Sequence, residues 1–386
     1  MNNFYYFNPT KILFGKGMIA RIRPELRDVN RVLVLYGQGS IQRNGVFQQV
    51  KDALGDIFCV GFGGIEPNPE YDTCLQAIDV AHGHEIDFIL AVGGGSVIDA
   101  AKFIALSYYS EEKEPWRIVT KEATAPVKVL PFGCIQTLPA SGSEMNNAFV
   151  LSRRSRRSKL SFSAITLYPR FSVLDPDTTR TLSHQQTALG MVDMYVHVLE
   201  QYVTYPAQAP LQDRQAEAVL ATLVEVAEPL LRHPDNYDLR SVVMWCGAQA
   251  ANGMLSRGVP TDWATHVIGH ELTALFDITH AQTLAIVLGG VFRHQLEQKK
   301  TKLAQYGRRI WGLSGSEESV ARESIDRTEE FFERLGVLTL FSAINLDAQT
   351  VVRAVREKCA AKTFQCFGEH GNIDLDAIEA ILMSRA

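Results

Sequence analysis

The stretch DFILAVGGGSVIDAAKFIAL, residues 87–106, constrains the fold more than any other part of this 386-residue chain. An apolar run of strand-forming residues leads into three glycines, and a helical pattern follows at once. Neighbouring parallel strands need a long crossover connection, which is usually a helix. The stretch therefore predicts one strand–turn–helix unit of a parallel α/β sheet.

The same alternation of β-rich and helical runs surrounds this unit. Short apolar runs at 31–37 and 56–62 precede it, helical patterns occupy 44–54 and 73–84, and a further strand begins the segment 128–144. Nearly continuous apolar strands suit a parallel sheet that is covered on both faces. We therefore expect a Rossmann-like α/β domain in the first part of the chain.

The predicted secondary structure changes after the segment 171–183. Long periodic helical stretches such as 213–231 and 322–336 follow, and β-rich runs become rare. A chain of this length is long enough for two domains, each with its own core. We predict an α/β domain over residues 1–180 and an all-helical domain over residues 181–386.

Composition limits the partners and the compartment. The net charge of -5 gives no reason to expect nucleic acid, and we interpret the basic run SRRSRRSK (152–159) as a solvated loop or turn. The six cysteines are scattered, which favours a reducing, cytoplasmic location. No apolar stretch reaches the roughly 20 residues of a membrane helix, so we expect no membrane association.

The glycine turn predicts a phosphate site. Consecutive glycines let the backbone approach a phosphate closely, and the helix start offers unpaired N–H groups. The turn departs from the GxGxxG fingerprint at Val97 and Ile98 and lacks the GxxxxGK[ST] pattern. A tight strand-to-helix connection without a ligand would also explain the glycines.

Two further turns support a dinucleotide crevice. TLPASGSE (137–144) supplies hydroxyl groups after another apolar strand, and the first strand ends in YGQGS (36–40). A site that selects unphosphorylated ribose normally places an acid after an early strand, but this chain has Gln38 beside Ser40. We therefore expect NADP rather than NAD.

Acidic and imidazole side chains gather in two apolar helical segments. Asp193 and His197 are one helical turn apart, and His266, His270 and His280 follow within one later segment. Burying each of these groups without a partner would cost several kcal/mol. One carboxylate and three imidazoles suit zinc or ferrous iron with an open position for substrate.

The spacing leaves open which three histidines bind the metal, since one could instead serve as a proton relay. Glu271 invites comparison with zinc proteases, but the order is HxxxHE and not HExxH. A hydrolase is correspondingly disfavoured.

Four segments together resemble the iron-containing, or group III, alcohol dehydrogenases: GGGSVIDAAK, TLPASGSE, GMVDMYVHVLEQYVT and DWATHVIGHELTALFDITHAQTLAIVL. The resemblance covers nearly the whole chain and is strongest to the branch of NADPH-dependent aldehyde reductases and butanol dehydrogenases. It implies a dehydroquinate synthase-like fold, in which a dinucleotide-binding domain precedes a helical metal-binding domain. It also implies a homodimer.

The resemblance implies a role for each matching residue. The divalent metal, iron or zinc, would be held by Asp193, His197, His266 and His280. Catalytic roles would fall to His270, Asp99 and Lys159. Contacts to NADP(H) would come from Gly37, Gln38, Gly39, Ser40, Asn68, Gly94, Gly95, Ser96, Asp99, Thr137, Ser141, Ser143, Asn146 and Lys159.

The implied activity is reduction of aldehydes to primary alcohols by hydride transfer to a metal-polarised carbonyl. Two features differ from close relatives, which have glycine in place of Gln38 and another loop in place of the arginine-rich segment 153–157. The alternatives are a polyol or glycerol dehydrogenase of the same family, a metal-dependent lyase or hydrolase, and a noncatalytic regulator.

Overall fold

The computed structural model describes residues 1–360 and 365–386 and divides the chain into two compact units. One unit, which we call the sheet unit, comprises residues 7–183 and 234–248. The other, the helical unit, comprises residues 1–6, 184–233 and 249–386. The domain division at residue 180 stays a prediction.

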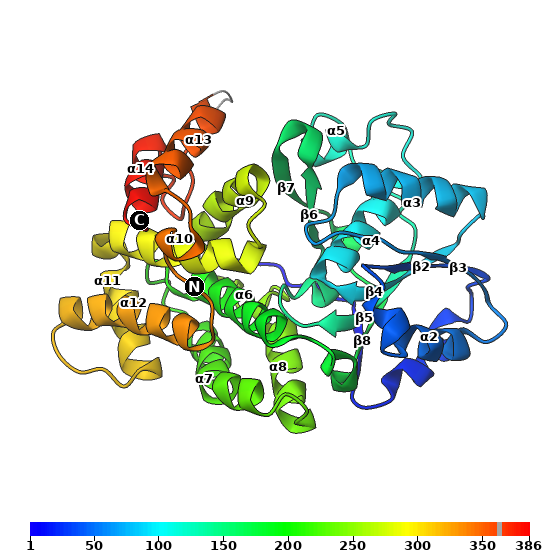
Figure 1. Cartoon of the computed structure of the whole chain (residues 1–386), viewed down its shortest axis with the longest axis horizontal. Helices are drawn as coiled ribbons and strands as arrows, with labels where there is room; N and C mark the ends of the chain where they lie inside the picture. The colour runs from blue at the N-terminus through cyan, green and yellow to red at the C-terminus, as the bar shows by residue number, and fades with distance from the viewer. Residues whose placement is uncertain (361–364) are drawn as a thin grey trace. The chain divides into compact units, whose positions relative to one another are not determined.

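The sheet unit is built on six parallel strands in the order β1-β8-β5-β4-β2-β3 (Figure 1). The expected parallel α/β architecture is confirmed. The strands are β1 (Lys11–Phe14), β2 (Arg31–Tyr36), β3 (Phe58–Phe62), β4 (Phe88–Gly94), β5 (Phe132–Leu138) and β8 (Phe171–Leu174). The helices of this unit are α1 (Ser40–Arg43), α2 (Val46–Leu54), α3 (Tyr71–Gly83), α4 (Gly95–Ser107) and α5 (Trp116–Val119), with short 3-10 turns that include η3 (Ser143–Met145).

Alternate residues of each central strand enter opposite cores, because successive side chains point to opposite faces. On β2, Leu33 and Leu35 pack in the core that contains α3 and α4. Val32 and Val34 pack in the core that contains α2. The helices that follow β2 and β4 therefore lie on opposite faces of the sheet.

The basic run forms the end of an antiparallel hairpin, β6 (Ala148–Arg153) and β7 (Ser158–Ser163). Arg154–Arg156 form the connecting turn, so this part of the run agrees with the interpretation of the sequence as a turn. Arg153 and Lys159, however, belong to strands, and both are largely buried. The guanidinium of Arg153 lies 4.6 Å from the centre of the Tyr71 ring, a cation–π contact that a solvated loop would not make.

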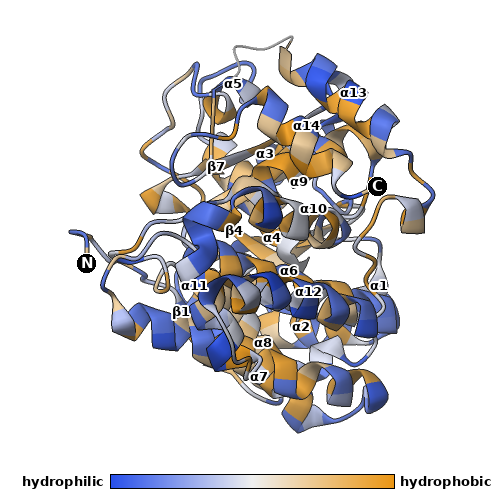
Figure 2. Ribbon diagram, turned by 90° about the vertical axis from the view of Figure 1, so that its left-hand side faces the viewer, coloured by the Kyte–Doolittle hydropathy of each residue, from blue (hydrophilic) through white to orange (hydrophobic). Residues whose placement is uncertain are grey.

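The helical unit contains the remaining long helices, as the periodic patterns predicted. Its central helix packs against five others and has apolar residues on nearly all sides, which is typical of a buried helix. Figure 2 shows hydrophilic residues over much of α11 and α12. The helices are α6 (His184–Tyr202), α7 (Pro210–Arg232), α9 (Ala264–Phe276), the central α10 (His280–His294), α11 (Leu296–Ile310), α12 (Glu317–Arg334), α13 (Ala348–Ala360) and α14 (Leu375–Met383). Helix α8 (Tyr237–Ala250) contributes residues to both units.

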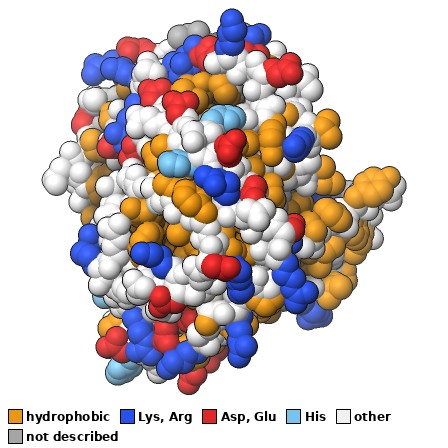
Figure 3. Space-filling view, turned by 90° about the vertical axis from the view of Figure 1, so that its right-hand side faces the viewer, with side chains coloured by type: hydrophobic (Ala, Val, Ile, Leu, Met, Phe, Trp, Pro, Cys, Tyr) orange, Lys and Arg blue, Asp and Glu red, His pale blue; other side chains and the backbone are white. Residues whose placement is uncertain are grey.

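The surface in Figure 3 carries acidic and basic side chains interspersed. Within residues 1–360 and 365–386, no helix combines the length and apolar composition that crossing a membrane requires.

Candidate functional site

Helix α6 supplies the first two of the predicted metal-binding side chains. Asp193 and His197 stand one turn apart in a helix whose residues 190–202 are all buried. Only 6% of Asp193 and 9% of His197 is exposed. The burial of a carboxylate and an imidazole on one helix face requires polar partners there.

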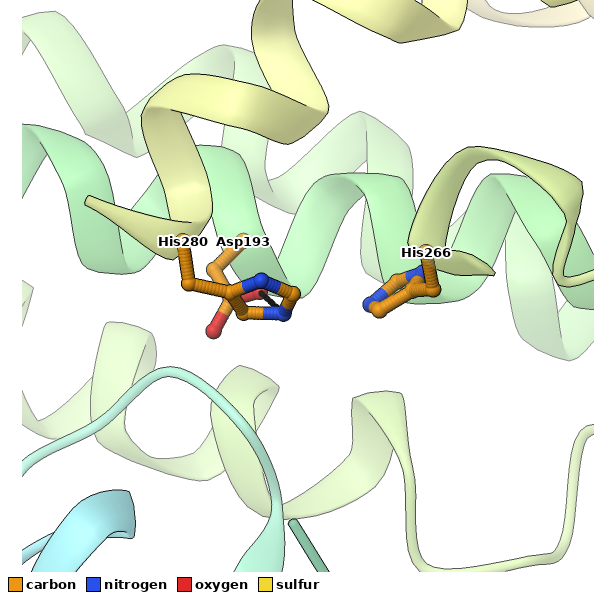
Figure 4. A group of neighbouring side chains, drawn as sticks. All are labelled: Asp193, His266 and His280. Carbon is orange, nitrogen blue, oxygen red and sulfur yellow. Dashed lines mark ion pairs between the residues drawn. The ribbon is translucent and has the colours of Figure 1, made fainter. Parts of the chain in front are cut away.

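Helices α9 and α10 bring His266 and His280 to Asp193. One potential ligand atom of each of the three residues lies within 4.8 Å of those of the other two. Figure 4 shows the two rings and the carboxylate pointing toward one another, with Asp193 beside His280 and His266 opposite them. Oδ1 of Asp193 lies 4.0 Å from Nε2 of His280.

The other two predicted histidines lie beside this group. The ring of His197 is centred 4.4 Å from that of His266, but its Nδ1 lies 2.8 Å from the backbone oxygen of Asp193. Burial lowers the pKa of His197, but the neighbouring Asp193 carboxylate outweighs this and leaves the pKa raised. The ring of His270 is centred 5.2 Å from that of His280.

Sequence reasoning missed Glu200, which orients His266. Its carboxylate is hydrogen-bonded to Nδ1 of His266 and accepts a 2.6 Å bond from the backbone N–H of Thr265. A carboxylate on one ring nitrogen fixes the ring so that the other nitrogen faces a metal. Burial raises the pKa of Glu200 to about 7. Its position seven residues after Asp193, on the same helix face, is the signal that would have revealed it.

The donor set fits a divalent transition metal. One carboxylate and two imidazoles, with His197 as a possible fourth donor, are the ligands that zinc and ferrous iron share in proteins. The group is buried among apolar helices and has a carboxylate behind one imidazole. These are the features of a metal centre rather than of a solvated acidic cluster.

The predicted dinucleotide turns follow three strands of the sheet unit. Residues 37–40 follow β2, Gly94 and Gly95 join β4 to α4, and residues 139–143 follow β5. Because β2, β4 and β5 are parallel neighbours, their carboxyl ends meet at one sheet edge. The helices after β2 and β4 cover opposite faces, and the order in which strands are added to the sheet reverses between these two strands. Doubly wound sheets bind nucleotides at such a point.

The glycines of the turn pack closely against the segment at the end of β5. A Cβ on Gly94 would lie 3.0 Å from Cβ of Leu138, and one on Gly95 would collide with Oγ of Ser141. No side chain caps the N-terminus of α4, so its first N–H groups remain available to an anion. The turns therefore fit a pyrophosphate.

Asp99 and Ser143 bind each other and the backbone. Oγ of Ser143 donates a 2.6 Å hydrogen bond to Asp99, which also accepts a 2.9 Å bond from the N–H of Val150. Burial raises the pKa of Asp99. These contacts join α4 to the η3 turn and to β6.

Lys102 is a second residue that sequence reasoning left without a role. Its fully buried ammonium donates to the carbonyl and hydroxyl oxygens of Ser143, to Oδ1 of Asn146 and to the carbonyl of Ala148, at 2.6–2.8 Å. Burial lowers the pKa of Lys102 to about 8. Its position one helical turn after Asp99 is the sequence feature that could have indicated a role for Lys102.

The remaining predicted cofactor residues also lie at these turns. Nζ of Lys159 donates a 2.8 Å hydrogen bond to Asn68, whose backbone N–H donates to Oγ of Ser96 at 3.2 Å. Gln38 donates through its amide to the Gly64 carbonyl at 3.2 Å. Thr137 stands half-buried near the end of β5.

Comparison with known proteins identifies relatives over the whole chain. Residues 9–176 match the family described as iron-containing alcohol dehydrogenase, and residues 187–385 match its C-terminal part. The chain is 45% identical to the NADPH-dependent aldehyde reductase YqhD of Escherichia coli strain K12, over 99% of each chain. It is 37% identical to the probable NADH-dependent butanol dehydrogenase 1 of Bacillus subtilis, also over 99% of each chain.

Solved structures agree. A crystal structure of E. coli YqhD superimposes with a TM-score of 0.96 at 43% identity and covers 100% of this chain and 99% of the other. The NADH-dependent butanol dehydrogenase A of Thermotoga maritima superimposes with a TM-score of 0.94 at 31% identity, with the same coverage. The predicted resemblance is confirmed: this chain belongs to the iron-containing alcohol dehydrogenase family.

Proposed function

We propose that this protein is a metal-dependent, NADP(H)-linked alcohol dehydrogenase that reduces aldehydes to primary alcohols. The observation that carries the proposal is the group of Asp193, His266 and His280, of which the first two are buried and the third is half-buried. It occurs in a chain with 45% identity, from end to end, to an NADPH-dependent aldehyde reductase.

Asp193, His266 and His280 would hold the ion, and the family resemblance adds His197. When bound, the divalent ion supplies Lewis acidity toward a carbonyl oxygen, and NADPH supplies the hydride. Glu200 keeps the His266 ring in its binding orientation. The apolar helices around the group exclude water and strengthen electrostatic interactions there.

His270 is the proposed proton donor for the product alcohol. Its ring lies next to that of His280, and an imidazole can hold or release a proton near neutral pH. Asp99 and Lys159 act through the turns that they organise: Asp99 joins α4 to η3, and Lys159 holds Asn68 beside Ser96.

The preference for NADP(H) rests on the turn after β2. No Asp or Glu occurs between Tyr36 and Lys51, so no carboxylate of this segment repels a 2'-phosphate. The relatives are named for both cofactors, NADPH for the E. coli enzyme and NADH for the B. subtilis enzyme. The cofactor therefore has to be measured on this chain.

The test is a panel of NADPH and NADH oxidation rates with short and long aldehydes, with glycerol in the reverse direction as a further arm. Each rate is measured after loading with iron, after loading with zinc, and with a chelator. We expect turnover of aldehydes with NADPH that chelation abolishes. Faster glycerol oxidation would indicate a polyol dehydrogenase, and no change in nicotinamide absorbance with any substrate would refute the proposal.

We also propose a cytoplasmic homodimer. All six cysteines lie in the described part of the chain and none forms a disulfide there, which suits a reducing compartment. Strand β1 is a sheet edge that pairs only with β8 among the described strands, and Phe14 on it is 39% exposed. Unpaired edge strands are ready sites for pairing with another chain. Light scattering of the purified protein gives the mass, and a monomer would contradict the proposal.

A further inference from the structure

Arg43 lies against the turn that follows β2. It is the last residue of α1, and its side chain is exposed. A Cβ built on Gly39 would lie 3.6 Å from Nη1 of Arg43. Gly39 has a φ of 83°, a left-handed conformation that favours glycine, and the absence of a side chain there leaves the guanidinium next to the backbone of the turn.

The charge of Arg43 is not neutralised locally. In the described part of the chain, no carboxylate forms an ion pair with this guanidinium. The nearest acid after the turn in sequence is Asp52, and its Oδ1 accepts a 2.7 Å hydrogen bond from Gln48. Gln38 adds only an uncharged amide. The turn therefore presents a single exposed cation.

The position of the turn determines which part of a dinucleotide it meets. In a doubly wound sheet the pyrophosphate lies at the glycine-rich helix start, and the residue that reads the 2'-position of the adenosine ribose follows a neighbouring strand. Here the glycine turn follows β4, and β2 is the neighbour of β4 across the switch. We assign the ribose 2'-position to the turn of residues 37–40, which follows this neighbour.

We propose that Arg43 is the specificity-determining residue that selects the 2'-phosphate of NADP(H) over the 2'-hydroxyl of NAD(H). A guanidinium presents paired N–H donors that match phosphate oxygens, and such charge-assisted bonds are among the strong ones. The hydroxyl of Ser40, also exposed at the turn, is a further donor to the same phosphate. The inference rests on the proposed NADP(H) dependence and names the group that would produce it.

The test uses two probes without nicotinamide, adenosine 2',5'-bisphosphate and 5'-AMP, which differ only by the 2'-phosphate. Calorimetric titration should show that the unaltered protein binds the bisphosphate more tightly. Arg43→Gln should weaken bisphosphate binding about tenfold or more, because it removes charge-assisted hydrogen bonds to the 2'-phosphate. Its affinity for 5'-AMP should change less than about twofold, since that probe offers no 2'-charge.

Two variants sharpen the result. Arg27→Gln makes the same charge change at an exposed arginine that precedes β2, at the opposite end of the strand, and should leave both affinities unchanged. Arg43→Lys keeps the charge without the planar fork and should bind the bisphosphate with intermediate affinity. In turnover, the KM for NADPH should rise in Arg43→Gln, while kcat and the KM for NADH stay the same.

Each other outcome contradicts the inference. Unchanged bisphosphate affinity in Arg43→Gln, while the unaltered protein still prefers this probe to 5'-AMP, would overturn the role of Arg43 and leave NADP(H) dependence standing. An equal loss for both probes would show a structural role instead. No preference for the bisphosphate in the unaltered protein would overturn both the inference and the proposed NADP(H) dependence.

Discussion

The metal group and the dinucleotide turns are built by different means. The metal group uses reactive side chains from α6, α9 and α10, held by a buried carboxylate, Glu200. The dinucleotide turns use the backbone: Gly94 and Gly95, which pack closely against Leu138 and Ser141, and the uncapped start of α4. The metal group thus depends on side-chain chemistry, whereas the glycine turn expected to meet the pyrophosphate depends on backbone geometry.

The difference predicts that each region can be disabled without the other. The largest effect is expected for His266→Ala, which removes one donor from the metal group. Metal content should fall to background, and turnover should fall by about a thousandfold or more, because Lewis acidity contributes several kcal/mol to transition-state stabilisation. Elemental analysis and NADPH oxidation measure the two effects.

The control is His294→Ala, which removes an exposed imidazole from α10. It should retain both metal and activity. Binding of adenosine 2',5'-bisphosphate should survive in both variants, since the turns do not depend on the metal group. Full activity of a metal-free His266→Ala protein would disprove the assignment of the metal group.

Glu200→Gln should have a smaller effect on the same region. The glutamine amide cannot hold the His266 ring as the carboxylate does. Loss of such a supporting group typically costs about 10- to 100-fold in metal affinity, so we expect the metal affinity to fall by about that factor. Competition with a chromogenic chelator measures the affinity. Glu225→Gln, an exposed acid on α7, is the matched control, and equal affinities in the two variants would show that Glu200 does not support the metal group.

Gly95→Ala tests the backbone-built region. The new methyl group would collide with Oγ of Ser141 and displace the backbone or the side chain at the turn, so we expect affinity for NADPH to fall about tenfold with metal content unchanged. Fluorescence titration of NADPH measures this. Gly83→Ala places a methyl group where no atom lies within 4 Å and should bind normally. Loss of metal from Gly95→Ala would show that the two regions are not independent.

The smallest effect is expected for Glu144→Gln, a change of stability beneath the turn after β5. Burial raises the pKa of Glu144 above its ordinary value of 4.5, and its carboxylate accepts a 2.8 Å hydrogen bond from Gln136. Above pH 4.5 the unfolded chain releases a proton that the folded chain retains, so the free energy of unfolding falls as pH rises through this window.

The amide carries no charge, so Glu144→Gln should be more stable than the unaltered protein by about 1 kcal/mol at pH 7 and equally stable near pH 4. Urea denaturation at both pH values measures the difference. The control, Glu111→Gln, changes an exposed acid and should alter stability at neither pH. A variant that is less stable at pH 7 would show that the charge of Glu144 is compensated in the folded protein.

The sequence predicted the parallel sheet, the helical unit and most of the metal group for one physical reason. Apolar patterns report burial, and an acid or imidazole inside an apolar pattern demands a partner. Asp193, His266 and His280 met that condition, and the structure brings them together. The inner strands β2, β4 and β5 were visible because both of their faces are buried.

Other features depended on long-range contacts that local patterns do not encode. Glu200 is 66 residues from His266, and Lys102 is 41 residues from Ser143, so neither partner could be inferred from spacing. The sequence did not predict strands β6 and β7, because their ends are rich in arginine and serine. Arg153 is buried because its guanidinium stacks on aromatic rings and pairs with a carboxylate, not because it is apolar. Ion pairing and cation–π contacts overrode the local preference for solvent.

The metal group links three helices that are far apart in sequence, through Asp193, His266 and His280, and this affects the stability of the protein in the cell. An ion held by side chains of three helices acts as a cross-link, and ligands that bind only the folded state shift the folding equilibrium by mass action. Metal scarcity would then expose the helical unit to proteases and reduce the amount of enzyme, so that supply of the ion sets abundance as well as turnover.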